Sequence, residues 1–214
     1  MIRHHPSDEL MLDYAAGSLG EASSLALATH LTLCPQCRAA NQRLDAVGGN
    51  FFAHPVEGTP GQETLNSVMA RISSEQAVPR AVAHPLHPAL PQPLRLALGC
   101  DLDAVPWKRL GIDAYQCVIS TRDKIATARL LRIPAGRPVP VHTHCGNELT
   151  LVLRGAFSDL TGNYTPGDFQ EADDRLVHQP HAEPAEDCVC LAVTEAPLQF
   201  KSWAARIVQP FLGI

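Results

Sequence analysis

The pattern of hydrophobic and polar residues changes about halfway along the chain. In the first 78 residues, apolar side chains recur every three or four positions, which is the spacing of one face of a helix. Ser7 can cap a helix start and Gly17 can end that helix, so a first helix is expected between them. Further helices are expected over residues 21–33, 35–47 and 61–74. This half is predicted to be a bundle of about four helices.

The second half, from about residue 100, carries short apolar runs instead. Four of these runs have the length and composition of strands: residues 114–121, 126–133, 149–153 and 189–193. Turn-forming Pro and Gly residues separate neighbouring runs. Many short strands between regular turns are typical of a β-sandwich or a β-barrel. The fold class expected for the whole chain is therefore α+β with two domains.

A proline-rich segment lies between the two halves. Residues 79–93 contain five of the eighteen prolines, and proline excludes both a helix interior and a central strand. The segment is interpreted as an extended linker in which His84 and His87 are solvated. The expected domains are residues 1–78 and 94–214, with few contacts crossing the boundary between them.

Composition narrows the class of protein. Of the 214 residues, 45% are hydrophobic and 18% are charged, which is typical of a globular chain. No apolar run reaches the roughly 18–20 residues of a membrane span, and no signal peptide is recognised. A cytoplasmic protein without membrane contact is therefore expected. Seven Cys and ten His in that reducing compartment favour metal binding or redox chemistry over disulfides.

The charge is distributed unevenly. The formal net charge is −5, and residues 1–75 hold four Arg against eight Asp and Glu, which leaves −4 in that segment. Direct contact with nucleic acid normally needs a basic face, so it is not expected. An acidic helical domain instead favours a basic protein partner. The alternative is an ordinary solvated acidic surface.

One candidate metal site lies where the second expected helix ends. His30 and Cys34 are four residues apart and therefore share a helix face, and Cys37 follows in the first turn of the next helix. Two thiolates and an imidazole suit Zn²⁺, which needs four ligands in a structural site. His4 and His5 are both candidates for the fourth ligand. The alternative is a pair of buried free cysteines beside a surface histidine.

A second candidate site follows in the strand-rich half. His142 and His144 point to the same side of an extended segment, and Glu148 can return to that side. His178 and His181 are both candidates for a further ligand. Three imidazoles and a carboxylate suit zinc, iron or manganese. The alternative is a set of exposed or hydrogen-bonded histidines on a loop.

The other five cysteines give no strong signal. They are interpreted as free thiols in the core or at the surface: Cys100, Cys117, Cys145, Cys188 and Cys190. Cys188 and Cys190 lie two residues apart on an expected strand and therefore share a face, and their role stays open. Cys145, next to His144, is a candidate for oxidation.

The second candidate site is similar to the first cupin motif at every marked position: Gly136-x5-His142-x-His144-x3-Glu148-x6-Gly155. The segment over residues 162–178 resembles the second cupin motif, with a longer spacing before its last residue. The first candidate site resembles the mark of the zinc-binding anti-sigma domain, His-x3-Cys-x2-Cys preceded by an N-terminal histidine. A chain with both motifs in this order is similar to the zinc-dependent anti-sigma factors of the ChrR type.

That resemblance implies specific roles. The helical domain would bind an extracytoplasmic-function-type sigma factor and hide the surfaces that bind RNA polymerase. The second domain would be a cupin β-barrel of the jelly-roll type, needed for the response to singlet oxygen and, in some members, organic peroxide. The implied ligands are His5, His30, Cys34 and Cys37 for the N-terminal zinc, and His142, His144, Glu148 and His178 for a second zinc in the cupin. A protease acting on the linker or on the released protein is a further candidate partner.

Two other functions remain open from the sequence. One is a metal-dependent cupin enzyme, a dioxygenase or an isomerase, fused to a zinc-stabilised helical module. A lone catalytic cupin would not need the cluster of His30, Cys34 and Cys37. The other is a cupin transcription factor that binds DNA directly, against which the net charge of −5 argues. The sequence therefore favours a regulator without enzymatic activity.

Overall fold

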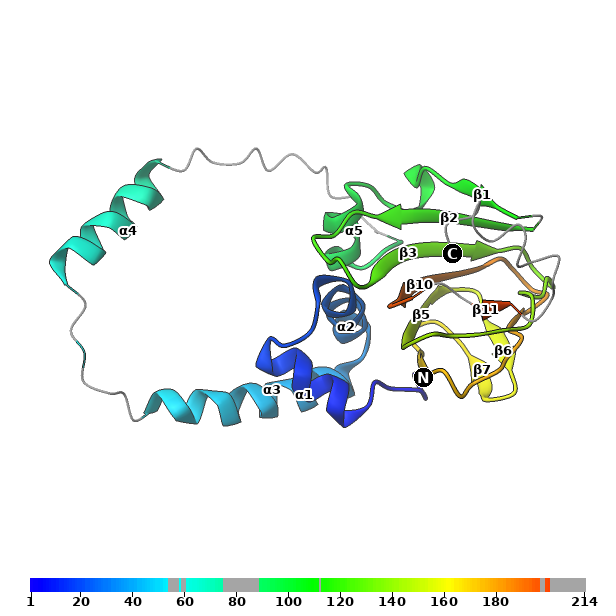
Figure 1. The fold of residues 1–214 in the computed structure, drawn as a ribbon, viewed down its shortest axis with the longest axis horizontal. Helices are drawn as coiled ribbons and strands as arrows, with labels where there is room; N and C mark the ends of the chain where they lie inside the picture. The colour runs from blue at the N-terminus through cyan, green and yellow to red at the C-terminus, as the bar shows by residue number, and fades with distance from the viewer. Residues whose placement is uncertain (54–57, 59–60, 75–88, 112, 197–198, 201–214) are drawn as a thin grey trace.

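The computed structural model of the chain describes residues 1–214 apart from 54–57, 59–60, 75–88, 112, 197–198 and 201–214 (Figure 1). His84, His87 and the expected domain boundary after residue 78 lie outside the described residues. The described α-helices are α1 (Asp8–Ala16), α2 (Glu21–Leu33), α3 (Pro35–Asn50), α4 (Gln62–Ser74) and α5 (Gln92–Leu98). None of them is long and apolar enough to span a membrane.

The strands follow α5 along the chain. They are β1 (Lys108–Leu110), β2 (Ala114–Ile119), β3 (Thr127–Ile133), β4 (His142–Thr143), β5 (Glu148–Arg154), β6 (Phe157–Asp159), β7 (Gly162–Tyr164), β8 (Phe169–Ala172), β9 (His181–Ala182), β10 (Cys188–Thr194) and β11 (Gln199–Phe200). Six of them form an antiparallel sheet in the order β1-β2-β3-β10-β5-β8, and a smaller sheet has the order β7-β6-β9. β4 pairs with β11. The predicted α+β class, with helices first and a barrel of short strands second, is confirmed (Figure 1).

The helix boundaries follow the capping residues that the sequence offers. The Ser7 hydroxyl accepts a hydrogen bond from the Leu10 N–H at 3.2 Å and so starts α1. Gly17 ends this helix with a φ of 71°. α2 ends at Cys34, and Pro35 begins α3 directly. The four helices expected from the sequence are therefore present, with α3 about one turn longer than expected.

The pattern of residues did not predict α5. Its prolines argue against a helix interior, but Pro93 lies in the first turn, where the missing N–H costs nothing. Leu94 in α5 and Leu90 just before it are almost completely buried. α5 packs against α2. The expected linker therefore ends in a helix that covers α2.

Helix α2 lies between the barrel and helices α1 and α3 (Figure 1). Its buried residues are Ala22, Ala26, Leu27, Thr29 and His30. α2 packs against α1, α3 and α5 on one side and against β3, β5 and β10 on the other. One continuous hydrophobic cluster joins Leu27 to Leu151 and Leu191 of the barrel. The expectation of few contacts between the two halves is therefore wrong, because a helix that is apolar on two sides must be covered on both.

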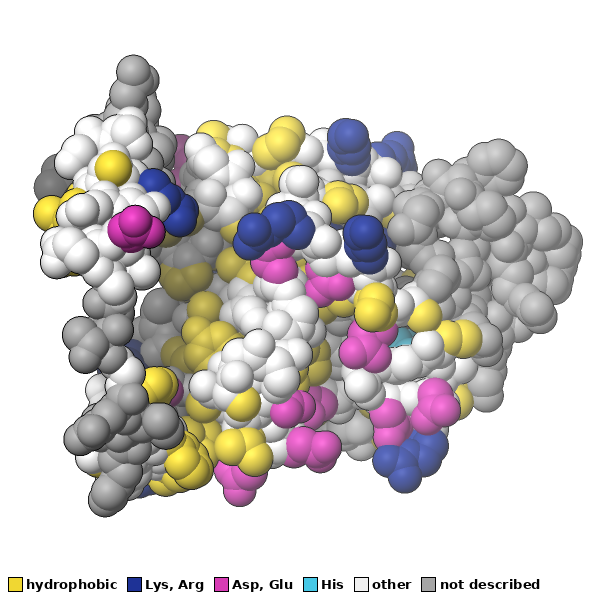
Figure 2. Space-filling model, turned by 60° about the vertical axis from the view of Figure 1, so that its left-hand side comes forward, with side chains coloured by type: hydrophobic (Ala, Val, Ile, Leu, Met, Phe, Trp, Pro, Cys, Tyr) yellow, Lys and Arg dark blue, Asp and Glu magenta, His cyan; other side chains and the backbone are white. Residues whose placement is uncertain are grey.

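Helix α4 differs from α2, because none of its residues is buried. Its apolar side chains at helical spacing are Leu65, Val68, Met69 and Ile72, with exposed fractions of 46–62%. Phe51 and Phe52, directly after α3, are also exposed. Figure 1 shows α4 set apart from the barrel, and Figure 2 shows exposed hydrophobic side chains on this side of the molecule. The amphipathic pattern of α4 is thus left without a buried face.

Candidate metal centres

Four side chains converge where α2 meets α3. His30 lies in the last turn of α2, Cys34 lies between the two helices, and Cys37 lies in the first turn of α3. His5 reaches the same point from the segment before α1, with its Nδ1 atom 3.5 Å from the Cys34 Sγ atom and 3.3 Å from the Cys37 Sγ atom. Ligand atoms of all four residues lie within 4.8 Å of one another. The structure therefore brings the predicted set together.

The surroundings of this helical cluster suit a metal cation. The His30 Nε2 atom is buried and has no hydrogen-bond partner in the part of the chain that the structure describes. Burial lowers the pKa of His30 to about 4 and keeps the ring neutral, as a metal ligand must be. Burial and the neighbouring Cys34 thiol raise the pKa of Cys37 to about 12, so the thiol keeps its proton until a cation displaces it. Two sulfurs and two imidazoles are a donor set for tetrahedral zinc.

Three imidazoles converge inside the barrel. His142 lies on β4, His144 follows two residues later, and the backbone of His178 pairs with that of His142. The His178 Nε2 atom lies 3.1 Å from the Nε2 atoms of both His142 and His144. All three rings are buried. The structure thus gathers three of the four residues predicted for this barrel cluster.

Each of these three rings has an oxygen atom beside its Nδ1 atom. The neighbours of His142, His144 and His178 are, in turn, the Pro140 carbonyl (2.8 Å), Glu148 Oε2 (2.9 Å) and Asp159 Oδ2 (2.7 Å). The oxygens beside His142 and His178 can accept hydrogen bonds from Nδ1, which fixes these two rings and leaves their Nε2 lone pairs for a metal. Glu148 lies within ion-pair distance of His144 without a hydrogen bond between these two atoms. Burial lowers the pKa of His142 to about 4, so this ring is neutral near pH 7. The cluster fits zinc, iron or manganese.

The Glu148 carboxylate lies next to the Nδ1 atom of His144. It is not part of the group formed by the three Nε2 atoms. Its carboxylate contacts His144, and the Thr150 hydroxyl donates a hydrogen bond to the Oε1 atom at 3.1 Å. Burial alone would raise the pKa of Glu148, but the contacts with His144, His142 and His178 outweigh it and lower the pKa. The carboxylate is therefore ionised, and its role as a metal ligand stays a prediction.

Two histidines that the sequence offers as alternatives lie outside both clusters. The His4 ring contacts the Tyr164 ring at a tilt of 37°, with 4.4 Å between the ring centroids. His181 is exposed on β9, and its Nδ1 atom lies 2.9 Å from the Gln179 carbonyl oxygen. The geometry therefore favours His5 over His4 in the helical cluster. It favours His178 over His181 in the barrel.

A small cavity lies beside the barrel cluster. Its volume is about 80 Å³, and its wall includes His142, His178, Cys188 and Cys190. Both cysteines are buried free thiols on β10, and they share a face as expected. The cavity has room for about two or three water molecules at ~30 Å³ each. Ordinary ligand pockets measure about 300–1,000 Å³, so this cavity is suited to a much smaller molecule.

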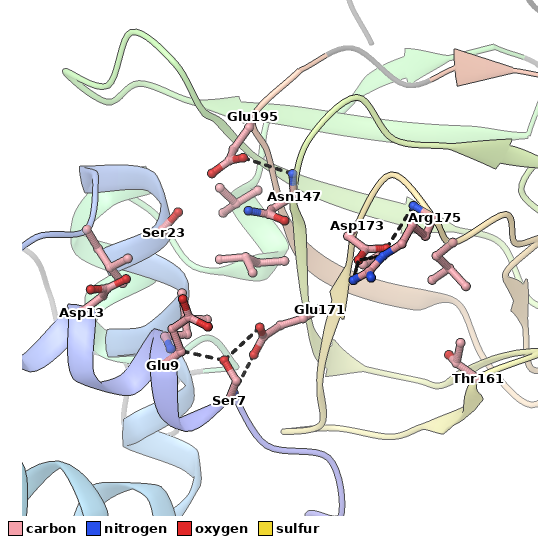
Figure 3. Close-up of a pocket in the computed structure, with 16 residues that line it drawn as sticks. Ser7, Glu9, Asp13, Ser23, Asn147, Thr161, Glu171, Asp173, Arg175 and Glu195 are labelled. Atoms are coloured by element: carbon pink, nitrogen blue, oxygen red, sulfur yellow. Dashed lines mark hydrogen bonds and ion pairs between the residues drawn. The ribbon is translucent and has the colours of Figure 1, made fainter.

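A larger cleft, of about 720 Å³, separates α1 and α2 from one edge of the barrel (Figure 3). The carboxylates on its walls are those of Glu9, Asp13, Glu171, Asp173 and Glu195. The Ser7 N–H and hydroxyl donate hydrogen bonds to the Glu171 carboxylate at 2.6 and 3.1 Å. The barrel and the start of α1 are therefore linked directly at this cleft, which the sequence did not predict.

The sequence also gave no indication of the groups that contact the Nδ1 atoms of the clustered imidazoles. Asp159 lies on β6, and no spacing rule relates it to His178. The His30 Nδ1 atom lies 2.9 Å from the carbonyl oxygen of Gly167, and a backbone carbonyl leaves no trace in residue type. The available signal was the turn at residues 166–168, which separates two expected strands and lies in the segment that resembles the second cupin motif.

The chain combines a helical His/Cys cluster with a barrel that contains a buried histidine cluster. This combination defines a class of two-part proteins whose second domain is cupin-like. Residues 97–198 match the family model described as the ChrR Cupin-like domain. Over 213 residues the chain is 47% identical to the anti-sigma-E factor ChrR of Cereibacter sphaeroides, covering 100% of this chain and 99% of that protein. The chain belongs to the ChrR family of anti-sigma factors.

A solved structure agrees with this assignment. The crystal structure of Rhodobacter sphaeroides SigE in complex with the anti-sigma ChrR matches with a TM-score of 0.79 and 45% sequence identity. The match covers 91% of this chain and 99% of that chain. The resemblance derived from the two motifs is therefore confirmed, and so is the combination of helical and cupin-like parts.

Proposed function

We propose that the protein binds an extracytoplasmic-function-type sigma factor through its N-terminal helices, keeps it from RNA polymerase, and releases it when an oxidant acts at the barrel. The protein thus acts as a negative regulator of transcription in the cytoplasm and not as an enzyme. The relative from R. sphaeroides forms a complex with SigE, and this supports the same class of partner here.

The exposed apolar face of α4 is the observation that carries this proposal. Its four apolar side chains lie on one side of the helix and are about half exposed. An amphipathic helix normally buries such a face, either within its own chain or against a partner. Phe51 and Phe52 extend the exposed apolar surface beyond α3. This surface is well suited to pack against a partner protein.

Charge supports a partner with a basic surface. Residues 1–75 carry a formal charge of −4, and Asp and Glu side chains are prominent on the central face in Figure 2. A DNA-binding protein such as a sigma factor is basic on its nucleic-acid face, so its approach is favoured electrostatically. Direct binding of this chain to DNA is disfavoured by the same charge.

We assign zinc to the helical cluster of His5, His30, Cys34 and Cys37, where it would hold α2, α3 and the N-terminal segment together. The barrel cluster, with His142, His144 and His178 and with Glu148 beside them, would hold a second metal, zinc or alternatively iron or manganese. The small cavity beside it favours a small oxidant such as singlet oxygen or a peroxide over an organic substrate. The enzyme alternative is therefore disfavoured.

The test of sigma-factor binding targets the apolar face of α4. The double variant Leu65→Ser and Ile72→Ser should bind an extracytoplasmic-function sigma factor from the same organism at least about 100-fold more weakly, because each lost apolar contact costs roughly 1.5–3 kcal/mol. The matched control is Ser67→Asn with Ser74→Asn, on the opposite side of the same helix. Affinity is measured by titration calorimetry with the full chain.

The control variant should bind like the unmodified protein. Equal affinity of all three proteins would show that α4 is not the docking surface. The absence of binding by the unmodified protein would reject the anti-sigma function itself.

A further inference from the structure

The turn between β7 and β8 holds the segment that precedes α1. Asp168 in this turn is completely buried. Its Oδ1 atom accepts hydrogen bonds from the backbone N–H groups of Arg3 at 2.6 Å and His4 at 3.0 Å. Its Oδ2 atom accepts from the N–H and hydroxyl of Thr165, both at 2.8 Å. Burial opposes ionisation, but the N–H groups of His4, Arg3 and Thr165 outweigh it and lower the pKa of Asp168.

Further contacts hold the same segment on the barrel. The Phe169 N–H donates a hydrogen bond to the His4 carbonyl at 3.1 Å, and the His4 ring packs against Tyr164. The Ser7 N–H is bonded to the Glu171 carboxylate. His5 lies between these anchored residues, so the barrel limits the positions that the His5 ring can take.

The same turn also contacts His30. The His30 Nδ1 atom lies 2.9 Å from the Gly167 carbonyl oxygen. A carbonyl oxygen can only accept, so the neutral ring carries its proton on Nδ1 and presents the Nε2 lone pair to a metal. Gly167 has a φ of 93°, and a Cβ atom there would lie 2.5 Å from the Ile2 Cδ1 atom. The N-terminal segment is therefore packed closely against the backbone that orients His30.

We propose that the barrel turn over residues 165–169 positions two ligands of the helical metal site. Gly167 orients His30, and Asp168 fixes the segment that carries His5. Retention of metal by the helical cluster then depends on the barrel, although all four ligands lie in the first 37 residues. This inference rests on the metal assigned above to that cluster and is independent of the identity of the partner.

Strand β8 also contacts a residue that orients a histidine of the barrel cluster. The Gln170 side chain, two residues after Asp168, donates a hydrogen bond to the Asp159 Oδ2 atom at 2.9 Å. That same oxygen lies 2.7 Å from the His178 Nδ1 atom. One short segment therefore contacts groups that orient histidines of both clusters. Metal binding at one cluster should then change the affinity of the other, since coupling between sites is reciprocal.

The experiment uses the full chain loaded with Co²⁺ in place of zinc. Thiolate-to-cobalt absorption reports the helical cluster alone, because the ligands assigned to the barrel cluster are imidazoles and a carboxylate. A competing chelator is then titrated. Asp168→Ala should lower the affinity of the helical site by about 10–100-fold, the usual effect of removing a group that orients a metal ligand. Asp168→Asn should restore part of it, because the amide oxygen can still accept from Arg3 and His4, whereas the amide nitrogen cannot accept from the Thr165 N–H.

The matched control is Asp173→Ala, which removes a partly exposed carboxylate just beyond β8 that pairs with Arg175. It should leave the cobalt affinity unchanged. A second variant, His4→Ala, removes only the ring that packs against Tyr164 and should weaken metal retention in the same direction if Asp168→Ala does not fold. Unchanged affinity in folded Asp168→Ala, or in His4→Ala where the first variant is unfolded, would overturn the proposal. No thiolate signal in the unmodified chain would instead reject the metal assignment of the helical cluster.

Discussion

The buried Asp159 carboxylate lies 2.7 Å from the Nδ1 atom of His178 and so links the smaller sheet to the barrel cluster. Burial opposes the ionisation of Asp159, but the bonds from His178, Thr161 and Gln170 lower its pKa well below the ordinary value. An ionised partner at Nδ1 makes the opposite nitrogen a stronger metal ligand. Asp159 therefore supports metal binding in the barrel cluster through His178, although it is not itself a predicted metal ligand.

Replacing this carboxylate should weaken metal binding in the barrel. We expect Asp159→Asn to lower the affinity of the barrel site by about 10–100-fold, because the amide is a weaker acceptor for the His178 N–H. Metal content after dialysis against a chelator measures the effect. Glu183→Gln is the control, since Glu183 accepts from Ser158 on the same strand β6 without contacting a histidine. Equal loss of metal from both variants would contradict the role of Asp159.

Local features of the sequence were sufficient to predict four of the described helices and most of the side chains that meet in the two clusters. Ser7 and Gly17 bounded the first helix because capping needs only neighbouring residues. The spacing of His30 and Cys34 and that of His142 and His144 placed each pair on one face. These predictions depend on periods of two and 3.6 residues, which the chain carries directly.

The contacts between the helical half and the strand-rich half could not be predicted from local sequence patterns. The Gly167 carbonyl and His30 are 137 positions apart, and any residue type would have supplied the oxygen. The position of α5 depended on a partner surface, because Leu94 is buried only when α2 lies beside it. The apolar residues on two sides of α2 were the available sign that a second layer would cover this helix.

A fragment of residues 1–78, supplied with excess zinc, should still bind and inhibit the sigma factor, since it holds all four ligands of the helical cluster and the exposed face of α4. Without the turn over residues 165–169 it should hold the metal more weakly than the full chain does. It should nevertheless be less stable than a fragment of residues 1–99, which keeps α5 over α2. Burial of Leu90 and Leu94 in the longer fragment contributes about 1.5–3 kcal/mol for each side chain. Urea unfolding and an in vitro transcription assay test both statements. A folded 1–78 fragment that fails to inhibit would refute the assignment of binding to the helices.

The stability of the metal-free protein should fall as the pH is lowered from about 6.5 to about 4. Burial lowers the pKa values of His30 and His142 to about 4 from an ordinary value of 6.5. In this pH range the unfolded chain binds protons that the folded protein excludes, so the free energy of unfolding decreases by about 3 kcal/mol for each histidine. More than about one pH unit above 6.5 both states are neutral at these rings and the dependence ends.

The measurement is urea unfolding of the chelator-treated protein across this pH range. His142→Leu should give a shallower dependence, because one of the two buried rings is gone. His181→Ala should not change it, because His181 is exposed on β9. A pH-independent free energy of unfolding between pH 4 and 6.5 would show that both rings can be protonated in the folded state.

The last prediction concerns release by oxidants. His142→Ala and Glu148→Ala should leave sigma-factor binding intact, because both residues lie in the barrel, away from α4 and the helical cluster. Release by singlet oxygen or an organic peroxide should be weakened, since these variants alter the metal site beside the small cavity. An oxidant can shift binding only if the altered barrel and the intact barrel leave different affinities for the sigma factor. The strand β8 and the turn before it provide a contact through which such a difference can arise.

The readout is expression from a target promoter with and without the oxidant, in variants whose circular dichroism and thermal melting match those of the unmodified protein. His181→Ala is the control, because it removes an exposed histidine of the same barrel from outside the cluster. A variant that folds, lacks the barrel metal and still responds fully to the oxidant would exclude the barrel cluster as the sensor. The helical cluster, with its two thiols in contact with His5, would then be the place where the oxidant acts.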